Sequence, residues 1–126
     1  MRFDYSHNLL PPGLLLPAFV RGLGTDDVAK VEAKVDTGAD LTVIPDSTRR
    51  QLKLKPCGYT YCRGAFDDQP QRVPTYFIEL SLDQTTYTKL EVLARPRATL
   101  LLGRDLLNDF VLHANGPEEY FELGDP

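Results

Sequence analysis

The chain has 126 residues and a formal net charge of −4 at pH 7. This length is typical of one domain with a sizeable core, and it is well short of two lobes of about a hundred residues each. No run of Lys or Arg is longer than Arg49-Arg50, so we expect neither nucleic acid nor an anionic membrane as a partner.

The N-terminal segment, residues 1–13, is predicted to be an arm that precedes a domain at residues 14–126. The apolar stretch at residues 9–20 is interrupted by prolines and a glycine, and it is too short to span a bilayer. It also lacks the clean basic start and the small-residue cleavage site of a signal peptide. We therefore expect a cytoplasmic protein whose arm either caps an interface between subunits or is disordered.

The first two strands are predicted at residues 14–23 and 29–35, with a turn at residues 24–27 between them. In the second strand apolar residues alternate with charged ones. Asp36 follows on the charged side of this pattern. Its carboxylate is therefore expected to leave the strand pointing away from the core.

Further along the chain, Asp46 is expected to be the N-cap of a short helix that runs to Leu52. Asn115-Gly116 indicates a hairpin near the C-terminus. The remaining predicted elements are strands at residues 59–62, 73–82, 86–94, 110–114 and 118–123, and a buried strand, a glycine and a short helix within residues 99–107. The sequence thus predicts an all-β domain with one or two short helices.

Cys57 and Cys62 are the only cysteines, and two thiols are too few for a four-ligand zinc site. If the residues between them are extended, the pair lies about 14 to 17 Å apart, which is beyond disulfide reach. Gly58 allows a closer approach. We expect two small, half-buried thiols in a reduced compartment, and no metal site.

Two motifs stand out against this background. Residues 36–40, Asp-Thr-Gly-Ala-Asp, follow the second predicted strand, and residues 99–107 read Thr-Leu-Leu-Leu-Gly-Arg-Asp-Leu-Leu. Asp-Thr-Gly alone occurs by chance in roughly 2% of chains of this length. Together, however, the two segments resemble the retropepsin family of aspartic proteases, and the chain is most similar to its single-domain bacterial members.

The resemblance implies a closed or partly open all-β barrel that corresponds to one lobe of a pepsin-like enzyme and assembles as a homodimer. It also implies an aspartic endopeptidase that acts on polypeptides. Such chemistry needs two carboxylates that share one proton, and this chain supplies the Asp36 loop once. The second carboxylate is therefore expected from Asp36 of another copy, with a water as the nucleophile and no cofactor.

The resemblance also assigns roles around Asp36. Gly38 is expected to adopt backbone angles that other residues avoid and to let chain segments approach closely. Thr37 is expected to hydrogen-bond across the dimer axis, and Asp40 to form an ion pair with Arg104; the alternative is two separately solvated charges. Asp105 is expected to be a cap or partner within its helix. The residues assigned to support of the catalytic loop are Thr37, Gly38, Ala39, Asp40, Gly103 and Arg104.

Ala39 stands where pepsin-like enzymes have a hydroxyl that bonds the catalytic carboxylate. Without that donor, we expect activity to extend from mildly acidic towards neutral pH.

A flap that covers the substrate is expected within the polar residues 63–70. Its candidate substrate-binding residues are Arg63, Gly64, Ala65 and Phe66. Viral retropepsins carry several glycines in the flap, whereas this chain offers only Gly64. Apolar walls of the cleft are expected from Leu41, Val43, Phe66, Phe77 and Leu100, although the sequence does not separate pocket from core.

Two alternatives to the protease remain open. The fold can serve as a dimeric peptide-binding or interaction module with little catalysis, because a fold does not guarantee its chemistry. In the other alternative, Asp-Thr-Gly is an accidental turn in an unrelated domain. That interpretation must also explain why Leu-Leu-Gly-Arg follows Asp-Thr-Gly at the separation expected for a retropepsin.

Overall fold

Alternating apolar and polar side chains produce the strands that build most of this protein. In the strand at Val28–Val35, Ala29 and Ala33 are buried, whereas Lys30 and Lys34 are exposed, as the sequence predicts. The structure is a computed structural model that describes residues 1–63 and 68–126. The expected all-β fold with short helices is confirmed. Its elements are β1 (Arg2–Asp4), β2 (Leu15–Gly22), β3 (Val28–Val35), β4 (Val43–Pro45), α1 (Asp46–Gln51), β5 (Gly58–Cys62), β6 (Gln71–Ser81), β7 (Thr86–Arg95), β8 (Leu100–Leu102), α2 (Arg104–Leu107), β9 (Val111–Asn115) and β10 (Tyr120–Gly124).

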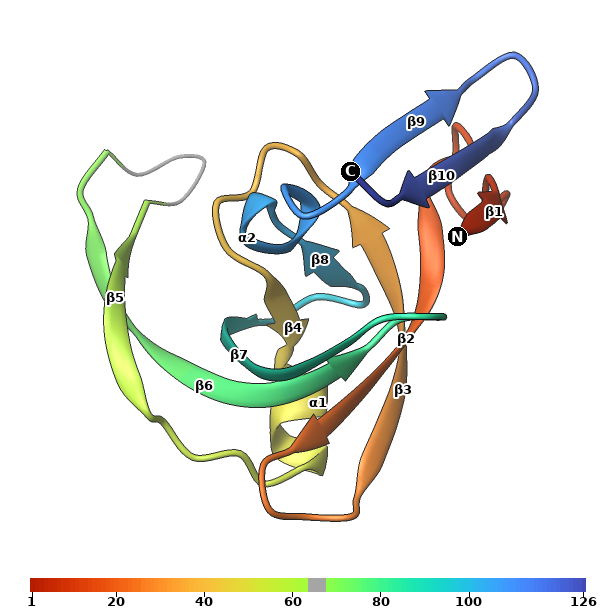
Figure 1. The fold of residues 1–126 in the computed structure, drawn as a ribbon. Helices are drawn as coiled ribbons and strands as arrows, with labels where there is room; N and C mark the ends of the chain where they lie inside the picture. The colour runs from red at the N-terminus through yellow and green to blue at the C-terminus, as the bar shows by residue number, and fades with distance from the viewer. Residues whose placement is uncertain (64–67) are drawn as a thin grey trace.

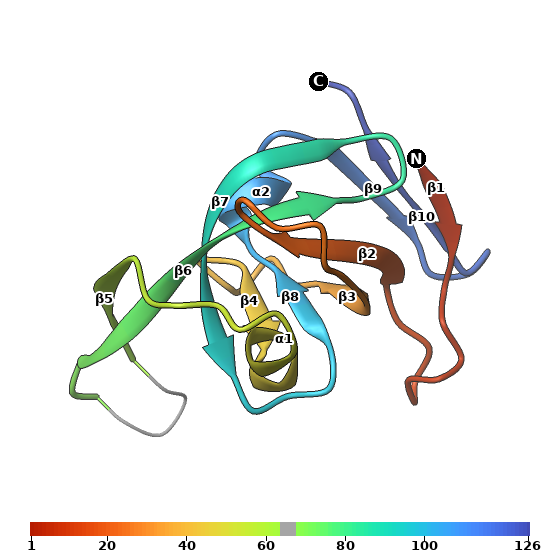
Figure 2. The same ribbon diagram turned by 90° about the horizontal axis from the view of Figure 1, so that it is seen from below.

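The larger sheet closes into a barrel (Figures 1 and 2). Its strand order is β2-β3-β8-β4-β7-β6-β5, and pairing of β2 with β6 completes the ring. The short strand β8 runs parallel to β3 and antiparallel to β4, so it lies between the strands that flank residues 36–42. The strand β5 pairs only with β6 and extends beyond the ring.

A second sheet packs against the barrel, with the order β1-β10-β9. Phe121 of β10 is fully buried, and its ring lies 5.4 Å from that of Phe3 and 6.4 Å from that of Tyr5, measured between ring centroids. The N-terminal segment therefore contributes aromatic side chains to the main core. Because β1 pairs with β10, the expectation of a disordered arm is wrong.

The start of α1 differs from the sequence prediction. The N-cap is Pro45, and Asp46 is the first residue of the helix, so its side chain does not cap. From this position the carboxylate accepts hydrogen bonds from Arg49 Nε at 2.6 Å and Arg50 Nη1 at 2.5 Å. The hydrogen bond from Arg49 is the main cause that lowers the pKa of Asp46.

The predicted hairpin between β9 and β10 is present, although its turn is longer than an Asn-Gly dipeptide suggests. Asn115 pairs with Tyr120, so residues 116–119 form the loop. The left-handed residue is Glu119, with φ of 54°, rather than Gly116. The side chain of Asn115 accepts a hydrogen bond from the Glu118 N–H at 3.0 Å, which stabilises the start of this loop.

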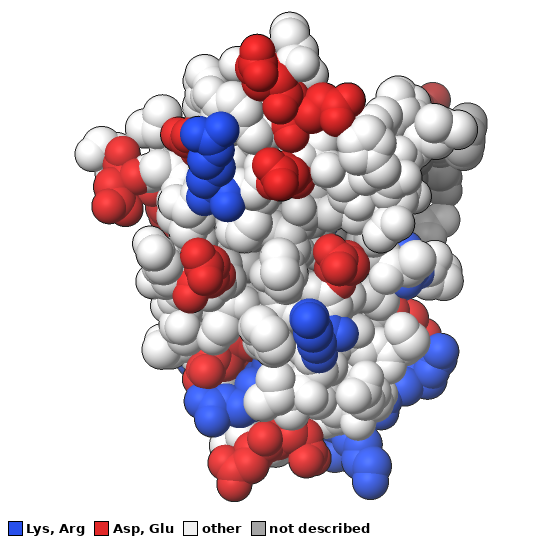
Figure 3. Space-filling model, turned by 90° about the vertical axis from the view of Figure 1, so that its right-hand side faces the viewer, with Lys and Arg blue, Asp and Glu red and all other residues white. Residues whose placement is uncertain are grey.

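The surface is mixed in charge on the side of the molecule that carries β1 and β2. There, acidic and basic side chains are interspersed among uncharged ones (Figure 3). Within the described ranges, no helix has both the length and the apolar character needed to cross a bilayer.

Gly103 joins β8 to α2 at a point where two chain segments nearly touch. A Cβ atom at this position would lie 2.6 Å from the carbonyl carbon of Leu41 and 2.9 Å from the backbone nitrogen of Thr42. Both contacts are with backbone, which cannot move aside as a side-chain end can. The glycine is thus required by the close approach of the two segments.

We expect Gly103→Ala to lower the free energy of unfolding by about 1 to 3 kcal/mol, because the methyl group overpacks this junction. Gly116→Ala is the matched control, since nothing lies within 4 Å of its added Cβ. Urea unfolding of both variants measures the difference. Equal midpoints for Gly103→Ala and the parent protein would contradict the steric argument.

Candidate active site

The Asp36 loop begins where β3 ends. The Asp36 N–H donates to the carbonyl of Leu102 in β8 at 3.1 Å, and the Ala39 N–H donates to the Asp36 carbonyl at 3.2 Å. The Asp36 side chain is half-buried, and its Oδ1 accepts the Gly38 N–H at 2.9 Å. One carboxylate oxygen is therefore held by the backbone of its own loop.

One of the two expected reasons for the glycine is wrong. Gly38 is not in the left-handed region, so its special backbone angles are not what the loop uses. A Cβ on Gly38 would instead lie 3.1 Å from Asp36 Oδ1. The glycine leaves room for the carboxylate beside the loop backbone.

Arg104 connects α2 to this loop. Its Nη1 donates to the Thr37 carbonyl at 2.7 Å, its Nη2 pairs with Asp40 Oδ1, and its backbone N–H donates to the Ala39 carbonyl at 2.8 Å. The expected ion pair is thus present, and the alternative of two separately solvated charges is wrong. Because the Asp40 side chain is 84% exposed, the pair contributes little to stability. The pair joins the start of α2 to the loop.

A second connection was not foreseen from the sequence. Thr42 is fully buried; its N–H donates to Asp105 Oδ2 at 3.0 Å and its hydroxyl to Asp105 Oδ1 at 2.9 Å. The same hydroxyl accepts the Gly103 N–H at 3.2 Å. Asp105 thus binds the segment after the Asp36 loop rather than its own helix, which corrects the expected role. One feature of the sequence does indicate this contact. Thr42 is the only polar residue in the apolar run 41–44, and a buried hydroxyl needs a hydrogen-bond partner.

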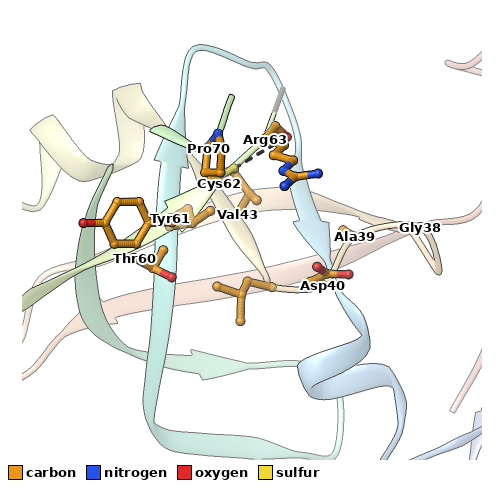
Figure 4. Close-up of a pocket in the computed structure, with 11 residues that line it drawn as sticks. Gly38, Ala39, Asp40, Val43, Thr60, Tyr61, Cys62, Arg63 and Pro70 are labelled. Carbon is orange, nitrogen blue, oxygen red and sulfur yellow. Dashed lines mark hydrogen bonds between the residues drawn. The ribbon is translucent and has the colours of Figure 1, made fainter. Parts of the chain in front are cut away.

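A cleft of about 520 Å³ lies beside the loop (Figure 4). Gly38, Ala39 and Asp40 line it from the loop, and Leu41 and Val43 follow on the same segment. The facing side comes from β5, the residue after it and the residue before β6, with a contribution from β7. These residues are Thr60, Tyr61, Cys62, Arg63, Pro70 and Leu93. The walls thus combine aliphatic side chains with the charges of Asp40 and Arg63.

Other predicted wall residues lie elsewhere. Phe77 lines a different hollow together with Leu52, and its ring lies 4.5 Å from the Nζ of Lys89. Leu100 is fully buried in the main core. Neither lines this cleft. Gly64, Ala65 and Phe66 lie outside the described residues.

Both cysteines are free thiols at the two ends of the segment that contains β5. Cys57 is exposed, which corrects the expectation that both are half-buried, and Cys62 is partly buried in the cleft wall. Among the described residues, no three His, Cys, Asp or Glu side chains are grouped so that they could hold a metal ion.

Comparisons with known proteins agree with this geometry. The retropepsin-like aspartic protease from Rickettsia conorii superposes with a TM-score of 0.68 at 15% identity, over 98% of this chain and 88% of that chain. The EIAV protease, in complex with the inhibitor HBY-793, gives a TM-score of 0.61 at 20% identity, over 82% and 92% of the two chains. The simian foamy virus protease gives a TM-score of 0.55 at 21% identity, over 75% of this chain and 92% of that chain. At these identities the likeness establishes the retropepsin-like fold.

No curated protein matches the sequence. The sequence profile of the aspartyl protease family matches residues 20–106, which include both the Asp36 loop and the Gly103-Arg104-Asp105 segment. The chain therefore belongs to the aspartyl protease family and has the retropepsin-like fold.

Proposed function

We propose that this protein is an aspartic endopeptidase that acts as a homodimer, with Asp36 of each subunit forming the catalytic pair. The observation that carries the proposal is the half-buried Asp36 carboxylate, fixed by the Gly38 N–H beside a cleft lined by the following residues. The sequence contains this loop once, so one chain holds half of the site. A two-fold axis next to the loop supplies the other half.

The chemistry follows from placing two carboxylates close together. They cannot both remain ionised cheaply, so one keeps a proton. The ionised carboxylate removes a proton from a bound water, and the water oxygen forms a bond to the carbonyl carbon of the scissile peptide. The protonated carboxyl donates to the developing oxyanion. Breakage of the C–N bond follows, with a proton passed back to the leaving nitrogen. In this proposal Thr37 hydrogen-bonds across the axis and keeps the two loops in register.

The cleft supports a peptide substrate in an extended conformation. Such a chain presents alternate side chains to opposite walls and its backbone to main-chain groups of the enzyme. Leu41, Val43 and Leu93 supply an apolar wall suited to an aliphatic side chain. The flap at residues 63–66 remains part of the proposal and would cover the bound peptide.

The proposed catalysis predicts that Asp36→Asn lowers kcat for a fluorogenic peptide by at least about a thousand-fold, because an amide cannot act as acid or base. Asp27→Asn, in the exposed turn before β3, is the matched control and should retain activity. Unchanged hydrolysis by purified Asp36→Asn protein would show that the pair is wrongly assigned. An inactive parent that still binds a statine-type inhibitor would favour the peptide-binding module.

Because half of the site belongs to each chain, specific activity should fall as the protein is diluted below the dimer dissociation constant. Sedimentation velocity at the same concentrations gives the fraction of dimer. We expect activity to follow that fraction. Constant specific activity in solutions that contain only monomer would rule out the shared site.

Arg104→Lys tests the positioning of the loop. A lysine cannot hold the Thr37 carbonyl and Asp40 together in the guanidinium geometry. We expect kcat to fall by about ten- to a hundred-fold, with a change in unfolding free energy below about 1 kcal/mol. Arg49→Lys, which alters the Asp46 pair in α1, is the control and should keep the parental kcat. A stability loss without a kcat loss would contradict the positioning role.

A further inference from the structure

A second hollow, of about 520 Å³, lies between β3, α1 and the N-terminal segment. Its volume is similar to that of the cleft beside the Asp36 loop, and among the described residues the two share no wall. α1 lies at the end of the barrel where β3 begins, whereas Asp36 follows the other end of this strand (Figure 1). The hollow is therefore a separate site, and the proposed catalysis does not use it.

β3 has a free backbone edge beside this hollow. β8 pairs only with residues 33–35 of β3, so the earlier residues of β3 have no neighbouring strand on that side in the described chain. The Val35 N–H donates to the Leu14 carbonyl at 3.1 Å, which lies on the side of β2. Because the direction of the backbone groups alternates along a strand, Lys30 and Glu32 turn theirs away from β2.

Three backbone groups on this edge lack a partner in the described part of the chain. They are the N–H and the C=O of Lys30 and the N–H of Glu32. The Glu32 carbonyl is used, because the parallel pairing of Ala33 with Leu100 supplies it with the Leu100 N–H. Pro17 lies opposite Glu32 in β2 and has no N–H to donate, which agrees with this direction. Two donors and one acceptor are thus open to another strand.

α1 turns a nearly buried hydroxyl towards the same hollow. Thr48 is 5% exposed, and its hydroxyl has no hydrogen-bond partner among the described residues. The hydroxyls of the other two buried threonines, Thr42 and Thr75, donate to carboxylates. In the described part of the chain every fully buried polar side-chain atom has a partner, so the Thr48 hydroxyl is reachable from the hollow that Thr48 lines. A nearly buried hydroxyl without a partner favours a ligand that can bond to it.

The side chains around the hollow indicate the class of ligand. Its described walls carry one cation, Lys30, and one carboxylate, Glu32. A phosphate group favours several cationic donors, and Mg²⁺ or Ca²⁺ favours several oxygen ligands, so this balanced pair suits neither. The amides of Asn8 and Gln51 and the apolar side chain of Leu9 add to the walls. This mixture matches a peptide, which presents N–H, C=O and apolar groups together.

We propose that this hollow binds an extended segment of a polypeptide as an additional strand on the edge of β3. The bound segment donates to the Lys30 carbonyl and accepts from the N–H groups of Lys30 and Glu32. One of its polar groups bonds to the Thr48 hydroxyl. Addition of a strand to a free sheet edge is a recurring mode of peptide recognition, and the volume of the hollow is within the range of ligand sites in proteins.

The occupant is a part of the polypeptide substrate away from the scissile bond, a statement that rests on the proposed function. Glu32 and Asp36 are four positions apart, which is about 13 Å of extended backbone. A segment held at the edge of β3 therefore does not touch the reacting atoms. Because it is held equally in the ground state and the transition state, its binding lowers KM for a long substrate rather than raising kcat.

NMR of the ¹⁵N-labelled Asp36→Asn protein with casein, an unfolded protein, tests the binding without hydrolysis. We expect the amide signals of Lys30 and Glu32 to shift when casein is added. Glu32→Pro removes one of the free N–H groups and should raise the dissociation constant for casein by about three- to ten-fold. Glu32→Gln is the matched control, because it keeps that N–H. Shifts confined to the residues of the Asp36 cleft would overturn the proposal. Shifts that follow the protein's own concentration without casein would identify a second copy as the occupant and also overturn it.

Thr48→Val provides a second test in the protein that retains Asp36. It keeps the shape of the side chain and removes the hydroxyl. We expect KM for casein to rise about three- to ten-fold relative to KM for a short fluorogenic peptide that occupies only the cleft. Thr48→Ser keeps the hydroxyl and should restore the parental ratio of the two KM values. An unchanged ratio in Thr48→Val would overturn the role of the hydroxyl.

The outcomes separate this site from the proposed catalysis. If the parent protein hydrolyses casein and Asp36→Asn does not, but the signals of Lys30 and Glu32 stay in place, the β3 site is wrong and the catalytic proposal stands. If these signals shift with casein and the parent protein does not hydrolyse it, the β3 site stands as a peptide-binding site and the catalytic proposal fails.

Discussion

The position of the Asp36 loop depends on the contact between Thr42 and Asp105. Thr42 is fully buried, so both its N–H and its hydroxyl need acceptors, and the Asp105 carboxylate supplies one oxygen to each. These bonds join segments 63 residues apart in the sequence. Hydrogen bonds to a charged group contribute more than neutral ones, and a buried donor left unpaired is costly. These hydrogen bonds therefore fix the position of α2 relative to the loop.

Two neighbours of Asp105 in the sequence are also involved where α2 approaches the loop. Gly103 permits this approach, because any side chain there would meet the backbone of Leu41 and Thr42. Arg104 uses it, because its guanidinium reaches both the Thr37 carbonyl and Asp40 from the start of α2. Three adjacent residues thus have three different roles. Gly103 allows close packing, Arg104 orients the loop, and Asp105 accepts hydrogen bonds from buried donors.

Local patterns predicted the strands and the position of Asp36. Successive side chains of a strand point to opposite faces, and residues 29–35 alternate between apolar and charged residues accordingly. The sequence also placed the glycine and helix after the buried strand at residues 100–102. It did not reveal the Thr42–Asp105 contact, since that pairing depends on how distant segments meet. It misassigned Asp46, because helix starts shift by a residue with tertiary context. It misplaced Phe77, because an apolar side chain fits either a cleft or the outer face of a strand.

In the proposed dimer, each chain contributes one incomplete half of the catalytic site, because it offers a single carboxylate loop. Within that half, the guanidinium of Arg104 contacts both the Thr37 carbonyl and Asp40, so the loop is held from the start of α2. Small displacements of reacting groups cost rate. The proposed catalysis therefore depends on how well each chain holds its own loop before the two copies meet.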